Sequence, residues 1–81
     1  MYTREKFGQE LKLKILQRQS ITNIGHWAYS VYLKNINDID LNFRDILLAL
    51  NTMEDGPEFA FTYKELEQIA DDLISGKQVK L

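Results

Sequence analysis

One segment near the C-terminus constrains the fold most, because it carries every local signal of a single amphipathic helix. Thr62 and Glu65 have the Thr-x-x-Glu spacing of a capping box, in which each side chain accepts a hydrogen bond from the other residue's amide. Phe61 and Leu66 flank this cap at the two positions of a hydrophobic staple. Gly76 follows where a left-handed residue commonly ends a helix. The pattern predicts one helix between Thr62 and Gly76.

Three earlier segments have the same helical periodicity. The first is predicted from the cap Thr3 to about Arg18, and the second from the cap Ser20 over residues 21 to 33. The third follows Asp40 or Asn42 as its cap and ends before the Gly-Pro pair at residues 56 and 57. Each helix has one apolar stripe that the others must cover, so the predicted fold is all-α, a compact four-helix single domain over residues 1–81. Its common core is expected to contain Leu11, Ile24, Val31, Ile46, Leu47, Leu50, Leu66, Ile69 and Leu73.

Two residues lie outside the simple stripes. Leu13 falls off the first stripe and is expected on the surface. Gly25 lies inside the second helix, where glycine costs about 1 kcal/mol relative to alanine. We expect this glycine to allow close packing of a neighbouring helix.

Size and composition exclude several classes of protein. The chain has 81 residues, 44% of them hydrophobic and 27% charged, and it contains no cysteine. Disulfides and thiolate zinc sites are therefore excluded, and stability must come from one apolar core. No apolar run reaches the roughly 18–20 residues of a membrane span, and residues 1 to 6 lack a signal-peptide apolar stretch. We expect a cytoplasmic protein without membrane contact, present as a monomer or homodimer.

Charge is segregated along the chain. Residues 1 to 18 carry five Lys or Arg and two Glu, a net charge of +3, whereas residues 35 to 62 carry six acids and one Arg, a net charge of −5. An acidic stretch beside aromatic residues combines electrostatic steering with apolar anchors, which favours protein binding. The predicted partner-binding residues are Asp38, Asp40, Asp45, Glu54, Asp55, Glu58, Phe59 and Tyr63.

Catalytic and metal-binding functions find little support. The spacing Asp38-x-Asp40-x-Asn42 opens like a calcium-binding loop, but the sixth position is Phe43 instead of glycine and the twelfth is Ala49 instead of glutamate. The single histidine, His26, has no nucleophile motif around it. The sequence therefore predicts no enzyme activity, no metal and no cofactor.

Nucleic-acid binding is the alternative function. The two middle helices could form a helix-turn-helix, and the first helix is basic. Against this, the third helix offers only Arg44 to phosphates, between Asp40 and Asp45, and the whole chain has a net charge of −2. A small helical regulator that uses its basic first helix remains the second hypothesis.

Three segments resemble the small all-helical immunity proteins of bacterial toxin systems. These are Ile24-Gly25-His26-Trp27-Ala28, the helix from Asp40 to Leu50, and Phe61-Thr62-Tyr63-Lys64-Glu65-Leu66. The resemblance extends over residues 20 to 75. It implies a non-enzymatic protein that neutralises a bacterial toxin by stoichiometric binding, with an acidic face toward a basic toxin domain.

Overall fold

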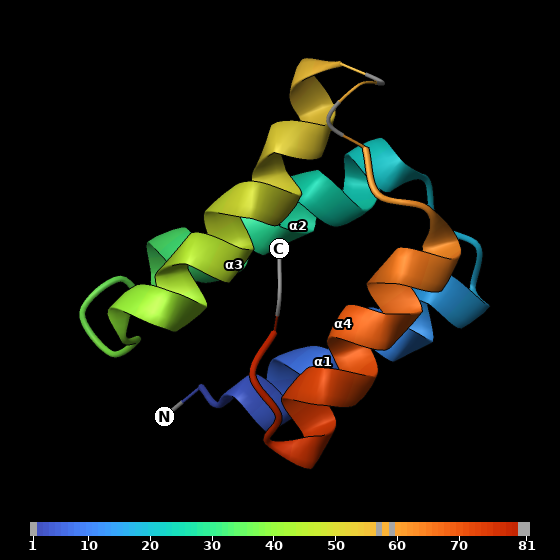
Figure 1. Cartoon of the computed structure of the whole chain (residues 1–81). Helices are drawn as coiled ribbons and strands as arrows, with labels where there is room; N and C mark the ends of the chain where they lie inside the picture. The colour runs from blue at the N-terminus through green and yellow to red at the C-terminus, as the bar shows by residue number, and fades with distance from the viewer. Residues whose placement is uncertain (1, 57, 59, 80–81) are drawn as a thin grey trace.

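Four helices and one short 3-10 turn make up the described part of the protein. The computed structural model describes residues 2–56, 58 and 60–79, and this part contains no strand (Figure 1). The predicted all-helical class with four helices is therefore confirmed. The elements are α1 (Arg4–Leu16), α2 (Ile21–Lys34), α3 (Leu41–Asn51), the 3-10 turn η1 (Thr52–Asp55) and α4 (Tyr63–Ser75).

The helices are arranged as two pairs. The first helix, α1, packs along the last, α4, and α2 packs along α3, with η1 continuing α3 over the N-terminal half of α2 (Figure 1). The chain therefore begins in one pair, builds the other pair, and returns to the first. The two pairs face each other across the core.

All four helices begin at a residue whose side chain caps the first turn. The side-chain oxygens of Thr3, Ser20, Asp40 and Thr62 each accept a hydrogen bond from the amide three residues later. These are the predicted caps, and Asp40 rather than Asn42 begins α3. Such a cap is worth about 1 kcal/mol. At Thr62 both hydrogen bonds of the predicted capping box form.

Two helices end in the same left-handed motif, but only one has a glycine there. After α4 the amides of Gly76 and Lys77 donate to the carbonyls of Leu73 and Asp72, with Gly76 at φ 76° as predicted. After α1 the left-handed residue is Arg18, at φ 57°. The prediction that this helix reaches Arg18 was therefore wrong by two residues, because the Schellman hydrogen bonds close the helix at Leu16.

The core lies between the two helix pairs, and a cluster of aromatic rings packs within it and against it. Phe7 stacks on Trp27 with ring centroids 4.6 Å apart and meets the edge of Phe43 at 5.7 Å. Tyr2 closes this cluster against both phenylalanines. All nine predicted core residues are buried, and so are Phe7, Phe43, Met53 and Val79. Burying each such side chain is worth roughly 1.5–3 kcal/mol, so this joint between the pairs supplies much of the stability.

Two glycines allow the close approach within the pairs. A Cβ on Gly25 would lie 2.9 Å from the carbonyl oxygen of Leu50, and one on Gly8 would lie 2.8 Å from that of Ala70. The prediction that Gly25 serves close helix packing is confirmed. The backbone of α2 therefore touches the C-terminal end of α3.

Candidate protein-binding surfaces

The predicted acidic residues do not form one continuous face. Asp38 and Asp40 precede α3, whereas Glu54, Asp55 and Glu58 follow it. Eleven helical residues separate the two groups, a distance of about 16 Å along the axis. All the predicted carboxylate residues are exposed. The structure thus divides them between the two ends of α3, with Asp45 on the helix itself.

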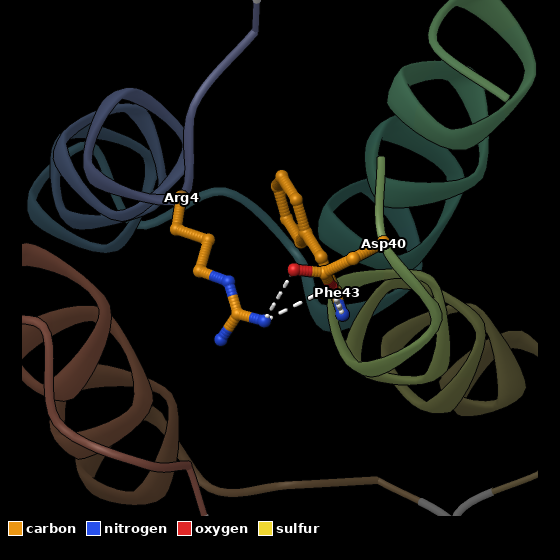
Figure 2. Close-up of polar contacts among 3 residues, drawn as sticks. All are labelled: Arg4, Asp40 and Phe43. Carbon is orange, nitrogen blue, oxygen red and sulfur yellow. Dashed lines mark hydrogen bonds and ion pairs between the residues drawn. The ribbon is translucent and has the colours of Figure 1, made fainter. Parts of the chain in front are cut away.

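Asp40 serves the fold rather than a free surface. Figure 2 shows Arg4 reaching from α1 to the carboxylate of Asp40, with 2.9 Å from its terminal nitrogen to each oxygen. The same carboxylate accepts the amide of Phe43 at 2.7 Å, which caps α3. That backbone hydrogen bond and then the Arg4 guanidinium lower the pKa of Asp40 below its ordinary value. The contact ties α1 to α3, and so joins the two helix pairs.

Asp45 and Glu54 each lie close to a basic side chain. A carboxylate oxygen of Asp45 lies 3.6 Å from the terminal nitrogen of Arg44, the preceding residue of α3. Glu54 lies 3.4 Å from Nδ1 of His26, a side chain that is largely exposed.

In the described part of the chain, the largest group of carboxylates without a lysine or arginine partner follows α3. We call Glu54, Asp55 and Glu58 the acidic end. Between Arg44 and Lys64 the sequence contains no lysine, arginine or histidine. Within the described residues no lysine or arginine forms an ion pair with any member of the acidic end.

The aromatic residues near the acidic end differ in how the structure places them. The hydroxyl of Tyr63 donates to the carbonyl of Gln19 at 2.7 Å, and its half-buried ring packs on the core. Phe61 also packs on the core, at the predicted staple position. Phe59 lies outside the described residues. Tyr63 is therefore held in place, with only part of its surface open to a partner.

The five basic residues of α1 and of the turn that follows it each have a partner in the same chain. Arg4 pairs with Asp40 and Lys12 with Asp71. The nitrogen of Lys14 lies 4.7 Å from the centre of the Trp27 ring, while Lys6 and Arg18 lie over the rings of Tyr2 and Tyr63. These side chains remain near the surface, but each is oriented by a partner in the same chain. The geometry gives the nucleic-acid hypothesis no unengaged row of cations on α1.

A surface that sequence reasoning missed is apolar. Tyr29 and Leu33 on α2, Ile36 in the following connection, and Leu41 at the start of α3 are all exposed. We call these four residues the α2–α3 outer face. In the sequence, Tyr29, Leu33 and Ile36 have the helical spacing i, i+4, i+7. These residues adjoin the buried stripe of α2, so the sequence pattern does not distinguish them from it. The predicted exposure of Leu13 is confirmed, at 57%.

The surface has shallow hollows, and in the most apolar of them the carboxylates of the wall already accept hydrogen bonds within the chain. This hollow of about 340 Å³ has Phe61 and Ile69 in its wall. Its carboxylates are engaged, since Glu65 closes the capping box and Asp72 accepts from Gln68 at 2.9 Å. Among the described residues no three histidine or carboxylate side chains are placed to hold a metal ion. No helix in this part of the chain has the length and apolar character needed to cross a membrane.

Among the residues that the structure describes, Tyr2 is the titratable group with the largest perturbation. Its hydroxyl donates to a carboxylate oxygen of Glu10. Burial, and then this hydrogen bond to a negative group, raise the pKa of the Tyr2 phenol well above its ordinary value. The phenol stays protonated at neutral pH and acts as a structural donor between the N-terminus and α1.

Comparison of the sequence with protein-family models and with curated proteins, and of the structure with solved structures, finds no match. Function must therefore be argued from the surfaces themselves.

Proposed function

We propose that this chain is a non-enzymatic protein-binding module that engages a basic partner through its acidic end. We further propose that the partner is a bacterial toxin domain, which the chain neutralises by stoichiometric binding. The observation that carries the proposal is the acidic end itself, where three exposed carboxylate residues occupy a stretch of sequence without a cation.

The charge arrangement supports binding over a purely solvated surface. Some charges elsewhere are paired within the chain, as Arg4 is with Asp40 and Lys12 with Asp71. The acidic end has only the largely exposed imidazole of His26 as a neighbour of opposite potential charge. A concentrated field of one sign accelerates encounter with an oppositely charged protein and selects against acidic partners.

Apolar contact would hold the complex after encounter. Phe61 and Tyr63 follow the acidic end in the chain and are half-buried, with their rings fixed against the core. Preorganised aromatic side chains lose little conformational entropy on binding and are frequent among the residues that dominate affinity. The proposed site therefore combines steering carboxylates with rigid rings.

The test reverses charge at the acidic end without touching the fold. Asp55→Lys with Glu58→Lys changes the net charge by four units at two exposed positions. The control variant, Glu5→Lys with Glu67→Lys, makes the same change in net charge at two exposed positions on α1 and α4. The binding partner to titrate is the product of the adjacent gene, at low and at moderate salt.

We expect the acidic-end variant to associate about tenfold more slowly at low salt, with a weaker salt dependence, and the control to associate nearly as fast as wild type. Equal association rates for the acidic-end variant and wild type would refute the proposal. If instead the wild type shifts duplex DNA, and Lys12→Ala with Lys14→Ala abolishes the shift, the nucleic-acid hypothesis replaces it.

A further inference from the structure

The α2–α3 outer face is an apolar surface that nothing in the described chain covers. Leu41 is 68% exposed, Leu33 52%, Ile36 49% and Tyr29 37%. Single exposed apolar residues are ordinary, but a contiguous group on one side of a small domain marks a contact surface. The question is whether the four share one side.

Helix geometry places Tyr29 and Leu33 on the same side of α2. They are four residues apart, and successive residues turn by about 100° around the axis. The buried stripe of α2 contains Ile24, Ala28 and Val31. Leu33 lies about 140° from Ala28 around the axis, so it faces away from the α1–α4 pair.

The pairing of α2 with α3 brings the other two residues to the same end of the pair as Leu33. Gly25 lies against Leu50 and Asn51, near the C-terminal end of α3. Since a short connection reverses the chain, the C-terminal end of α2 comes level with the first turn of α3 (Figure 1). That turn carries Leu41 about 140° from the buried residue Ile46 and about 180° from Leu50, around the axis of α3. Leu33, Ile36 and Leu41 therefore lie at the same end of the α2–α3 pair, and the two leucines are on helix sides that face away from the buried stripes.

The charged residues around this face alternate in sign. Lys34 and Asp38 flank Ile36, and Arg44 and Asp45 follow Leu41 along α3. Asp40, directly before Leu41, is paired with Arg4, so three cations and three carboxylates give no net charge, unlike the acidic end. A strongly basic or acidic partner would bring like charges together at half of these positions. In a two-fold symmetric pair of identical surfaces, each cation of one copy can lie near a carboxylate of the other copy.

We propose that the α2–α3 outer face binds a second copy of this chain, forming a two-fold symmetric dimer. The two α2–α3 pairs pack outer side to outer side, and the α1–α4 pairs lie at the far ends of the dimer. The acidic end of each copy follows α3 and is not part of the apolar group, so dimerisation and the proposed partner binding are separate properties.

The exposed area sets the expected strength. The exposed parts of the four side chains amount to roughly two whole large side chains, on the order of 300–400 Å² per copy. With the charged rim included, each copy would bury about twice that area, close to the lower limit of a standard interface, which is about 600 Å² per partner. Interfaces at this limit are weak, so the dimer is expected to form with a Kd on the order of 10–100 μM.

The experiment compares the same substitution at two equivalent helix positions. Leu33→Lys and Leu16→Lys both place a lysine in the last turn of a helix, where it suits the helix dipole. Leu16 is 75% exposed but belongs to α1, away from the proposed interface. Leu41→Glu serves as a second interface variant, because a carboxylate suits the first turn of α3. Sedimentation velocity on the full chain from about 1 μM to 500 μM measures the association.

We expect the wild-type mass to rise from that of one chain toward that of two across this range. Leu33→Lys and Leu41→Glu should each raise Kd at least tenfold, because each would bury an unpaired charge, while Leu16→Lys stays within about twofold of wild type. Circular dichroism checks that every variant is folded. A wild-type chain that remains monomeric at 500 μM overturns the proposal, as does a Leu16→Lys variant that weakens association as much as Leu33→Lys.

Discussion

Asp40 has two structural roles that substitution can separate. Its carboxylate caps α3 through the Phe43 amide and pairs with Arg4 on α1 (Figure 2). Removal of an N-cap costs about 1 kcal/mol. The ion pair is partly exposed, with 34% of the Arg4 side chain and 63% of the Asp40 side chain accessible, so it is worth about 0.5 kcal/mol. Asp40→Ala should therefore lower the free energy of unfolding by roughly 1.5 kcal/mol.

Two companion variants assign this loss to its causes. Asp40→Asn keeps a capping oxygen but removes the charge, and Arg4→Ala removes the pair but keeps the cap. Each should cost about 0.5 kcal/mol, one third of the Asp40→Ala effect. Urea unfolding followed by circular dichroism at neutral pH measures all three. Thermal unfolding should show the Asp40→Ala midpoint about 6–12 °C below wild type. Equal stability of Asp40→Ala and Asp40→Asn would refute the assignment of the larger share to the cap.

Acid titration provides an independent check on the same residue. Because the Phe43 amide and then Arg4 lower the pKa of Asp40 in the folded state, the unfolded chain binds a proton at this site more readily. The resulting stabilisation is fully present above the unfolded pKa of about 4 and is lost as pH falls through the lower folded pKa. The stability difference between wild type and Asp40→Asn should thus be largest near neutral pH and shrink in acid. A difference that is constant with pH would contradict this account.

Two further changes test the core and the helix ends. Leu50→Ala truncates a fully buried side chain and should cost about 2–5 kcal/mol in urea unfolding, whereas Leu13→Ala at an exposed position should stay within about 0.5 kcal/mol of wild type. Equal effects would mean that the core is placed wrongly. Arg18→Gly should raise stability by up to about 1 kcal/mol, because glycine adopts the left-handed φ of 57° without the cost that a side chain incurs. A destabilised Arg18→Gly variant would show that the contact of Arg18 with the Tyr63 ring, at 6.0 Å, outweighs backbone strain.

The candidate site was only partly predictable from sequence. The exposure of the predicted carboxylate residues agrees with their polar pattern. The sequence did not reveal that Asp40 is engaged by Arg4, 36 residues away, because that contact depends on how α1 packs near the start of α3. Nor did it separate the carboxylates into two groups. The α2–α3 outer face was missed because exposed and buried apolar residues have the same spacing on a helix, and only the position of the neighbouring helices distinguishes them.

Local chemistry alone determined where most helices begin and what they contribute to the core. The Thr62–Glu65 box and Gly76 act through hydrogen bonds that span a few residues, so their spacing is enough to predict them. The end of α1 had no such signal, since Arg18 adopts a conformation that its residue type does not favour. The stacking of Phe7 on Trp27, the Arg4–Asp40 pair and the uncovered side of α2–α3 were decided only in the tertiary structure. These features depend on distances between residues far apart in sequence, which arise when the two helix pairs pack and bury their common apolar surface.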